Sequence, residues 1–188
     1  MYTGSERTIV DVTYLTDHLC GPARPRPFRG VVTVVAKLLN ITRADFVYFG
    51  EKDAQQLAII RRMVEDLNIP TRIVAVSTVR EADGLALSSR NQHLTDEDRK
   101  VAVIIYKALV IAKTAIISGE KNAAVVLSIA RKKLQTQPLA RVEYFEIVDA
   151  VDMQPVEVIR TPVRVVTAVW VGGTRLIDNV LCNPNEQI

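Results

Sequence analysis

The first part of the chain alternates between apolar and polar blocks that predict helix, strand, helix and strand. Val31–Leu39 predicts a helix, and the aromatic and β-branched run Ala44–Gly50 is typical of a buried strand. Thr71–Ser77 predicts a second strand. Between the strands, a helix is expected over Asp53–Leu67, where four apolar residues recur at helical spacing on one face: Leu57, Ile60, Val64 and Leu67.

A strand, a helix and a strand within about thirty residues favour a parallel pair of strands joined by a right-handed crossover. Ligands of such sheets bind at the carboxyl ends of the strands, which are Gly50 and Ser77 in this chain. Before these elements, Cys20–Gly30 contains three prolines, two glycines and three arginines, so we expect a loop there.

The second half of the chain has helices followed by strands, without alternation. Thr95 is expected to cap a long helix that ends near Gly119, and another helix is expected over Asn122–Leu134. Three strands follow, and two glycines join the last two strands as a hairpin: 141–149, 163–171 and 174–182. This order predicts a second, α+β domain, so we divide the chain into domains 1–78 and 79–188.

Composition and charge narrow the class of protein. The chain has 188 residues, 48% of them apolar and 24% charged, and a formal net charge of +3. These values are ordinary for a globular protein and favour neither nucleic acid nor a membrane as partner. No apolar run approaches the about 20 residues that cross a bilayer, and Met1–Val10 lacks a signal-peptide hydrophobic region, so we expect a cytoplasmic protein. Cys20 and Cys182 lack metal or redox spacing and are expected to be free thiols.

Polar residues gather just after the first predicted strand. Gly50 removes a side chain where a ligand can meet the backbone, and the helix start that follows attracts an anion such as phosphate. Lys52 adds a cation for a polyphosphate, Asp53 has oxygens for ribose hydroxyls, and Gln56 offers a donor and an acceptor to a substrate. The alternative stays open that Asp53 only caps the helix and that the glutamines form a solvated face.

A second polar run, Thr78–Thr95, follows the second strand and lacks helical or strand periodicity, which indicates a functional loop. Ser88, Ser89 and Arg90 offer two hydroxyls and a planar cation, which suit a phosphate chain and a leaving pyrophosphate. The alternative is a serine-rich turn with a surface arginine.

Other polar residues give weaker signals. Arg24, Arg26 and Arg29 either extend an anionic site or face water. His18 and His93 have no nucleophile at triad spacing. No metal cage formed by protein side chains alone is visible, so a magnesium ion would arrive with a nucleotide and be held mainly by its phosphates and water.

Four segments together resemble the pantoate–β-alanine ligase (pantothenate synthetase) family. "FGEKD.QQL" and "READGLA.SSRN", at the separation seen in this chain, are highly specific as a pair. The resemblance also covers "GVVTVVAKLLNI" and "GTRLIDN" and extends from about Leu19 to Cys182.

The resemblance implies a fold and an activity. The expected fold is α/β: a partial Rossmann-like, nucleotidyltransferase-type parallel sheet that binds ATP and pantoate, followed by a small α+β C-terminal lid domain. The implied reaction uses ATP and Mg²⁺. Pantoate and ATP give pantoyl adenylate and pyrophosphate, and β-alanine then displaces AMP to give pantothenate. A homodimer is also expected from the resemblance.

The resemblance also assigns roles by matching position. Gly50 and Asp53 would contact the adenosine, Lys52 the phosphates, and Gln56 the pantoate. Val79 and Leu87 would line the adenine site. The triphosphate and the departing pyrophosphate would be held by the remaining three residues, Ser88, Ser89 and Arg90.

The chain also departs from the family pattern. The family's HxGH motif, which binds nucleotide phosphates, occurs nowhere in the sequence. We therefore expect the C-terminal two-thirds of a longer enzyme, with little activity alone. Pro27 stands where the family usually has histidine, and Ala54 where it usually has tyrosine. Two alternatives stay open: a non-catalytic truncated or dimerising fragment that needs a separate N-terminal half, and a nucleotidyltransferase that acts on another acid.

Overall fold

The chain forms two compact units, Met1–Ser77 and Thr78–Ile188, here called the N-terminal and C-terminal units. The computed structural model describes residues 4, 7–23 and 25–186, and each unit is described by itself. The sequence predicts a boundary after residue 78, and the binding and lid roles given to the two domains stay predictions.

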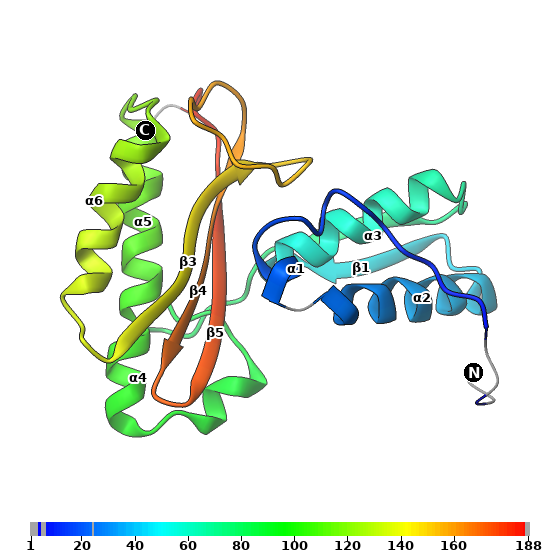
Figure 1. The fold of residues 1–188 in the computed structure, drawn as a ribbon, viewed down its shortest axis with the longest axis horizontal. Coiled ribbons are helices and arrows are strands. Elements are labelled where there is room, and N and C mark those ends of the chain that lie inside the picture. Colours follow the sequence, from blue (N-terminus) through cyan, green and yellow to red (C-terminus); the bar gives the residue numbers. More distant parts are fainter. Residues whose placement is uncertain (1–3, 5–6, 24, 187–188) are drawn as a thin grey trace. The chain divides into compact units, whose positions relative to one another are not determined.

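The N-terminal unit contains a parallel pair of strands, and Figure 1 shows the first of them, β1, beside helices α2 and α3. Strands β1 and β2 lie side by side, with Phe46 opposite Arg72 and Gly50 opposite Val76, so both carboxyl ends meet at one edge. The crossover helix α3 contacts β1, and α2 contacts α3. In chain order the elements are α1 (Cys20–Ala23), α2 (Pro25–Thr42), β1 (Phe46–Gly50), the 3₁₀ turn η1 (Glu51–Asp53), α3 (Ala54–Asp66) and β2 (Arg72–Val76).

The expected loop over Cys20–Gly30 is wrong, because α1 ends at Ala23 and α2 begins at Pro25. Prolines in the first turn of a helix remove only N–H groups that have no intrahelical partner, and their fixed φ suits a helix start. Pro25 and Pro27 stand in that turn, so they are compatible with the start of α2. Arg24 lies outside the described residues, as do the side chains of Arg26 and Pro27.

The prediction that Ala44–Gly50 is a buried strand is also wrong in its burial. Along β1 exposed and half-buried residues alternate, and Phe46 and Tyr48 are 54% and 66% exposed. Val47 and Phe49 are half-buried on the other face. The pair β1–β2 is thus half-covered within the part of the chain that the structure describes, with its second face open.

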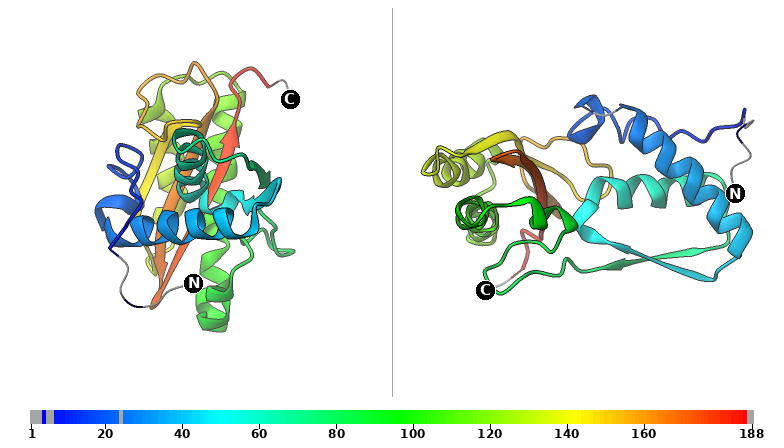
Figure 2. Two further views of the ribbon diagram at one scale, coloured as in Figure 1. Left: turned by 90° about the vertical axis from the view of Figure 1, so that its right-hand side faces the viewer. Right: turned by 90° about the horizontal axis from the view of Figure 1, so that it is seen from below.

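The C-terminal unit is a three-stranded antiparallel sheet covered by helices on one face. The strands have the order β3–β4–β5, and α5 and α6 are seen nearly end-on beside the sheet in the right-hand view of Figure 2. The elements are the 3₁₀ turn η2 (Ser89–His93), α4 (Asp96–Ala102), α5 (Ile104–Ile117), α6 (Ala123–Gln135), β3 (Ala140–Asp149), β4 (Val163–Val171) and β5 (Thr174–Cys182).

The predicted elements of this unit are largely confirmed. Thr95 caps α4, because its hydroxyl accepts a hydrogen bond from the Asp98 N–H at 3.1 Å. Val171 pairs with Thr174, so residues 172 and 173 form a tight hairpin. The expected single long helix is divided at Val103, which nevertheless keeps helical backbone angles (φ −59°, ψ −22°). The core joins both layers, and its largest fully buried side chains include Phe145, Ile105, Leu109, Ile116, Leu134 and Ile159.

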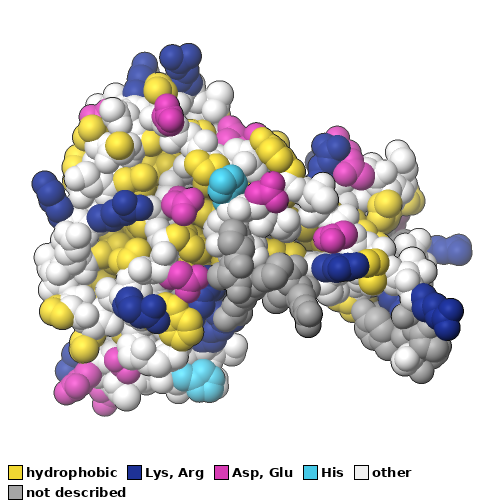
Figure 3. Space-filling model, viewed as in Figure 1, with side chains coloured by type: hydrophobic (Ala, Val, Ile, Leu, Met, Phe, Trp, Pro, Cys, Tyr) yellow, Lys and Arg dark blue, Asp and Glu magenta, His cyan; other side chains and the backbone are white. Residues whose placement is uncertain are grey.

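The face of the molecule shown in Figure 3 has no dominant charge, because Lys and Arg side chains are interspersed there with Asp and Glu side chains. Among the described residues no helix is both long and apolar enough to span a membrane.

Candidate functional site

In the N-terminal unit, the predicted ligand turn joins β1 to α3 through η1. Gly50 has ordinary extended angles (φ −68°, ψ 136°), and a Cβ at this position would meet nothing within 4 Å. Neither backbone conformation nor packing within the described residues requires a glycine here. The glycine leaves open space at the carboxyl end of β1, where a ligand of a parallel sheet is expected.

Lys52 and Asp53 follow within this turn. Lys52 is half-buried in η1, and Asp53 is exposed at the N-cap position of α3. The Asp53 side chain makes no capping hydrogen bond to α3, so the alternative that this residue serves as a helix cap is not what the structure shows. The Asp53 carboxylate therefore accepts no hydrogen bond from the N–H groups of the first turn of α3.

The two adjacent glutamines of α3 have different surroundings. Gln55 is buried, and its amide ties the segment before α1 to α3: Oε1 accepts from the Cys20 N–H at 3.1 Å, and Nε2 donates to the Leu15 and His18 carbonyls at 2.9 and 2.8 Å. Gln56 is half-buried, and its side chain has no hydrogen-bond partner among the described residues. Gln55 is thus structural, and of the two side chains only Gln56 has an amide available to a ligand.

In the C-terminal unit, Val79 and Leu87 face each other across a short hairpin. The Leu87 N–H donates to the Val79 carbonyl at 2.9 Å, and Arg80 pairs with Ala86 as an antiparallel bridge. Directly opposite residues of an antiparallel pair have side chains on one face. Val79 and Leu87 are 62% and 55% exposed, so the hairpin presents two neighbouring apolar side chains.

Ser88–Arg90, here called the serine–arginine turn, follows this hairpin directly. Ser88 caps η2, and its Oγ accepts from the Arg90 N–H at 3.3 Å. Ser89 is exposed and has no partner among the described residues. Arg90 is exposed and donates one Nη1 bond to the Arg175 carbonyl of β5 at 3.1 Å, which leaves its other N–H groups for an anion.

A partly buried ion pair fixes the hairpin to β5. Arg80 donates to both oxygens of Asp178, at 2.7 and 2.9 Å, and also to the Gly84 carbonyl at 3.1 Å. The Arg80 guanidinium also lies over the Tyr106 ring, 3.8 Å from its centre. A bidentate pair of this kind restricts the orientation of the Arg80 guanidinium more than a single hydrogen bond does.

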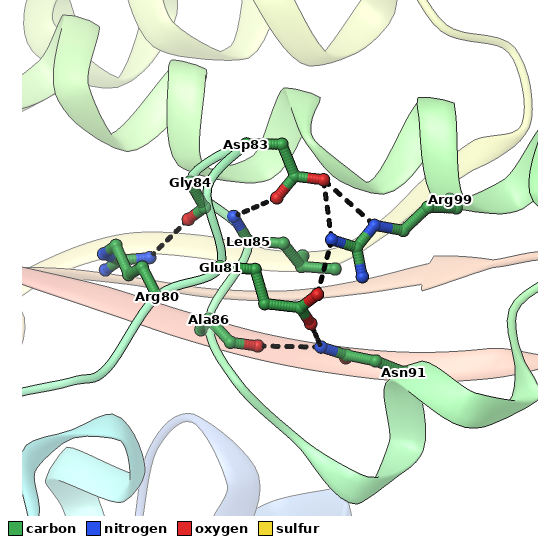
Figure 4. A network of polar contacts seen from close by, with 8 residues as sticks. All are labelled: Arg80, Glu81, Asp83, Gly84, Leu85, Ala86, Asn91 and Arg99. Carbon is green, nitrogen blue, oxygen red and sulfur yellow. Dashed lines mark hydrogen bonds and ion pairs between the residues drawn. The ribbon is translucent and has the colours of Figure 1, made fainter.

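A second polar cluster holds the tip of the hairpin (Figure 4). Arg99 of α4 donates to Glu81 at 2.8 Å and to Asp83 at 2.6 and 3.0 Å. Its hydrogen bond, with a second one from Asn91, lowers the pKa of Glu81. The Leu85 N–H and then Arg99 lower the pKa of Asp83, and the two carboxylates raise the pKa of Arg99. All three groups are therefore charged at neutral pH.

The structure thus gathers the predicted residues into two groups. Four lie on the β1–α3 turn of the N-terminal unit: Gly50, Lys52, Asp53 and Gln56. Five lie on the hairpin and the turn of the C-terminal unit: Val79, Leu87, Ser88, Ser89 and Arg90. Arg29 is half-exposed beside Asp11 at 3.9 Å, and its predicted contact with an anion stays a prediction. Neither Cys20 nor Cys182 forms a disulfide.

Reasoning from the sequence missed Gln55, Arg80, Asn91 and Arg99. Gln55 had a usable signal, since it precedes Ile59 and Met63 at four-residue spacing on a helix and thus shares their buried face. The partner of Arg80 is 98 residues away in sequence and that of Arg99 is 18 residues away, and no local pattern indicates such pairs.

Comparison with known proteins adds an independent line of evidence. The family model described as pantoate-beta-alanine ligase matches residues 1–181. The chain is 50% identical to the pantothenate synthetase of Moorella thermoacetica over 186 residues, which are 99% of this chain and 66% of that protein. It is also 50% identical to the Enterococcus faecalis pantothenate synthetase over 179 residues, 95% of this chain and 64% of that protein.

Solved structures give the same result for the fold. The crystal structure of pantothenate synthetase from Thermus thermophilus has a TM-score of 0.91 and 41% identity, and the match covers 96% of this chain and 65% of that one. The ligase from Francisella tularensis, determined in complex with beta-gamma ATP and beta-alanine, has a TM-score of 0.69 and 31% identity, with coverages of 95% and 60%. The predicted α/β nucleotidyltransferase-type fold is confirmed.

The matches also bear on length. The chain spans slightly less than two-thirds of the curated relatives that it matches, with 66% of the Moorella protein and 64% of the Enterococcus protein. These percentages say only how much of each relative is matched, and they do not say which part of it. The expectation that this chain is the C-terminal two-thirds of a longer enzyme is therefore not supported. With nearly the whole chain matched by family model, sequences and structures, the protein belongs to the pantoate–β-alanine ligase family.

Proposed function

We propose that this chain acts in the ATP-dependent joining of pantoate to β-alanine, which gives pantothenate, AMP and pyrophosphate. The observation that carries this proposal is the 50% identity to a pantothenate synthetase over 99% of this chain. The Francisella relative determined with beta-gamma ATP and beta-alanine supports the same substrates.

The chemistry has two steps. A carboxylate oxygen of pantoate attacks the α-phosphorus of ATP, the bond to the α,β-bridging oxygen breaks, and pyrophosphate leaves. The neutral amine of β-alanine then attacks the acyl carbon of pantoyl adenylate, the bond to the AMP oxygen breaks, and the amine loses a proton. No protein nucleophile is needed, so positioning and charge stabilisation account for catalysis.

Each unit contributes one part of this chemistry in the proposal. On the β1–α3 turn, Gly50 and Asp53 contact the adenosine, Lys52 the phosphates, and Gln56 the pantoate. The open space at Gly50, the uncapped position of Asp53 and the uncommitted amide of Gln56 support these roles. The N-terminal unit is therefore the proposed ATP- and pantoate-binding domain.

In the C-terminal unit, the proposed lid, Val79 and Leu87 contact the adenine, and their paired apolar side chains suit its flat face. Ser88, Ser89 and Arg90 hold the triphosphate and stabilise the charge that grows on the departing pyrophosphate. The exposure of Ser89 and Arg90 supports this role, because both side chains are accessible to an anion.

Magnesium enters the proposal with ATP. Mg²⁺ in nucleotide sites keeps several waters and is held largely by phosphate oxygens. We therefore assign the ion mainly to the phosphates and water.

Pantoate-dependent exchange of labelled pyrophosphate into ATP tests the first step, and β-alanine-dependent release of AMP tests the second. Lys52→Ala is expected to slow exchange by about 100-fold, since removing one preorganised donor costs about 3 kcal/mol. Lys132→Ala removes an exposed lysine of α6 and is the matched control, for which the wild-type rate is expected.

Gln56→Ala is the companion variant for the acid. Its KM for pantoate is expected to rise more than its KM for ATP, because an interaction with one substrate is lost. An equal rise in the KM for pantoate and the KM for ATP would reject the proposed contact between Gln56 and pantoate. Exchange that depends on a different acid would favour another nucleotidyltransferase, and exchange no faster than that of Lys52→Ala would favour a non-catalytic fragment.

Two substitutions bear on the rate of this chain. Pro27 and Ala54 stand where the family usually has histidine and tyrosine. Restoring Ala54→Tyr is expected to raise the exchange rate if that position limits the site. A rate unchanged by Ala54→Tyr would exclude this position as the cause.

Assembly and location complete the proposal. We expect a homodimer in the cytoplasm, on the resemblance to the family and the ordinary surface charge. Sedimentation equilibrium of the purified chain tests the first expectation, and a concentration-independent monomer mass would reject it.

A further inference from the structure

The serine–arginine turn has little support of its own. Within Ser88–Arg90 one hydrogen bond is formed, from the Arg90 N–H to Ser88 Oγ at 3.3 Å, and just beyond the turn the Asn91 N–H donates to the Ser88 carbonyl at 3.0 Å. A short exposed segment with so few bonds is expected to sample several conformations unless neighbouring elements restrain it.

Two side chains restrain this turn: Arg90 donates from Nη1 to the Arg175 carbonyl of β5 at 3.1 Å, and Asn91 holds the end of the turn. Asn91 Nδ2 donates to Glu81 Oε1 at 2.6 Å and to the Ala86 carbonyl at 3.1 Å. Its Oδ1 is buried and has no donor within the described part of the chain. The Asn91 side chain is therefore held through Nδ2 alone, and the Glu81 carboxylate and the Ala86 carbonyl together determine where that nitrogen lies.

Arg99 in turn orients Glu81. The oxygen of Glu81 that does not bind Asn91 accepts from Arg99 Nη2 at 2.8 Å, so each carboxylate oxygen has one donor (Figure 4). The same Arg99 guanidinium binds Asp83 through Nε and Nη2, which fixes the plane of the fork. An unbroken polar relay thus runs from helix α4 to Asn91.

We propose that Arg99 is a positioning residue that orders the serine–arginine turn through Glu81 and Asn91. The role in ATP binding rests on the proposed function, whereas the ordering itself does not. The Arg99 guanidinium donates to Glu81 and Asp83, neither of which belongs to the turn, so it acts through other residues and not as a catalytic group.

Stability alone does not account for this arrangement. The Arg99, Glu81 and Asp83 side chains are 28%, 31% and 35% exposed, and ion pairs at such sites add little to the free energy of unfolding. The specific consequence of the relay is that it orients the Glu81 and Asn91 side chains. Loss of Arg99 is expected to loosen residues 88–94 while the sheet and the helices stay folded.

Amide hydrogen exchange at pH 7 tests the ordering without any assay of activity. In Arg99→Ala the hydrogen-bonded amides of Arg90, Asn91 and Leu94 are expected to exchange about tenfold faster than in the wild type. Glu81→Gln is the second variant, because one of the two acceptor oxygens becomes an NH2 group that cannot accept from Arg99 or Asn91.

Arg131→Ala is the matched control. Arg131 lies in the same unit and donates to the Phe145 carbonyl at 2.6 Å, away from the turn. This variant is expected to leave exchange in residues 88–94 unchanged, even if its melting temperature falls as far as that of Arg99→Ala. The proposal would be overturned if the amides of residues 88–94 exchanged at equal rates in the wild type, Arg99→Ala and Glu81→Gln.

Kinetics test the consequence for ATP. Arg99→Ala is expected to raise the KM for ATP about tenfold and that for pantoate less than twofold, since a small misplacement of binding groups is costly. A loss of folded protein alone would lower the measured kcat and leave both KM values unchanged. If the wild type shows no exchange of pyrophosphate, the proposed function fails, and the amide exchange still decides whether Arg99 orders the turn.

Discussion

Gln55 and Gln56 are neighbours with the same side chain, and the fold gives them opposite environments. Gln55 is buried and makes three hydrogen bonds to the backbone of residues 15–20, whereas Gln56 makes none among the described residues. A buried amide with all these partners fixes the segment before α1, so replacing it should leave backbone groups unsatisfied.

Gln55→Leu is therefore expected to lower the free energy of unfolding of the N-terminal unit by about 1–3 kcal/mol. The measurement is urea unfolding, with the alkylation rate of Cys20 as a local probe, because the Cys20 N–H is one of the released donors. Gln56→Leu is the control and should change the free energy by less than about 0.5 kcal/mol. Equal effects of the two substitutions would reject the structural role of Gln55.

Cys182 gives a prediction for alkaline pH. Burial raises the pKa of this thiol from 9.0 to about 11, so the folded state keeps its proton where the unfolded state loses it. The stability that this group contributes is present below pH 9 and is lost as the pH rises to about 11, on the order of 2–3 kcal/mol. Cys182→Ala is expected to reduce this loss in urea titrations at pH 8 and 10.5. An equal fall in the free energy of unfolding between pH 8 and pH 10.5 in both proteins would contradict the raised pKa of Cys182.

At the scale of elements, the β4–β5 hairpin depends on one of its two glycines. Gly172 has a φ of +54°, and a Cβ there would lie 2.7 Å from an Asp98 carboxylate oxygen. Gly173 has no such strain and no atom within 4 Å of its Cβ position. The two adjacent glycines therefore differ in backbone conformation and in the space around them.

Gly172→Ala is expected to destabilise the C-terminal unit by about 1–2 kcal/mol, because alanine disfavours a left-handed conformation and Asp98 must move. Gly173→Ala is the matched control and should have a much smaller effect. Thermal unfolding followed by circular dichroism measures both. Equal melting temperatures for the two variants would show that the hairpin tolerates a side chain at position 172.

Local patterns predicted most elements, and contacts between distant residues account for what they missed. The strand pair, the cap at Thr95 and the hairpin follow from periodicity, capping and turn chemistry within short windows. The start of α2 at Pro25 does not follow from proline composition, because a proline that begins a helix and a proline in a loop count alike. The exposure of Phe46 and Tyr48 depends on what covers the sheet, which a strand's own sequence does not encode.

At the scale of the whole molecule, the residues that point to ATP chemistry were visible in the sequence, but their supports were not. Lys52, Gln56 and Arg90 belong to contiguous motifs. Arg80 and Arg99 find their acidic partners only through the fold, at separations of 98 and 18 residues. A motif thus identifies the groups that meet a ligand, and the structure identifies the groups that hold them.

The two units are expected to unfold separately, because each has its own core and the cores differ in extent. The N-terminal unit has a two-stranded sheet with Phe46 and Tyr48 exposed, and small sheets of this kind are marginally stable. The C-terminal unit buries side chains from three strands and two long helices. The N-terminal unit should therefore unfold at the lower urea concentration.

Two probes separate these transitions in one sample. Trp170, the single tryptophan, lies in β4 and reports the C-terminal unit by fluorescence, whereas pulse alkylation of Cys20 followed by mass spectrometry reports the N-terminal unit. Cys182 is fully buried and should become reactive together with the Trp170 transition, which makes it an internal control. Coincident midpoints for Cys20, Trp170 and Cys182 would show one cooperative transition and reject separate unfolding.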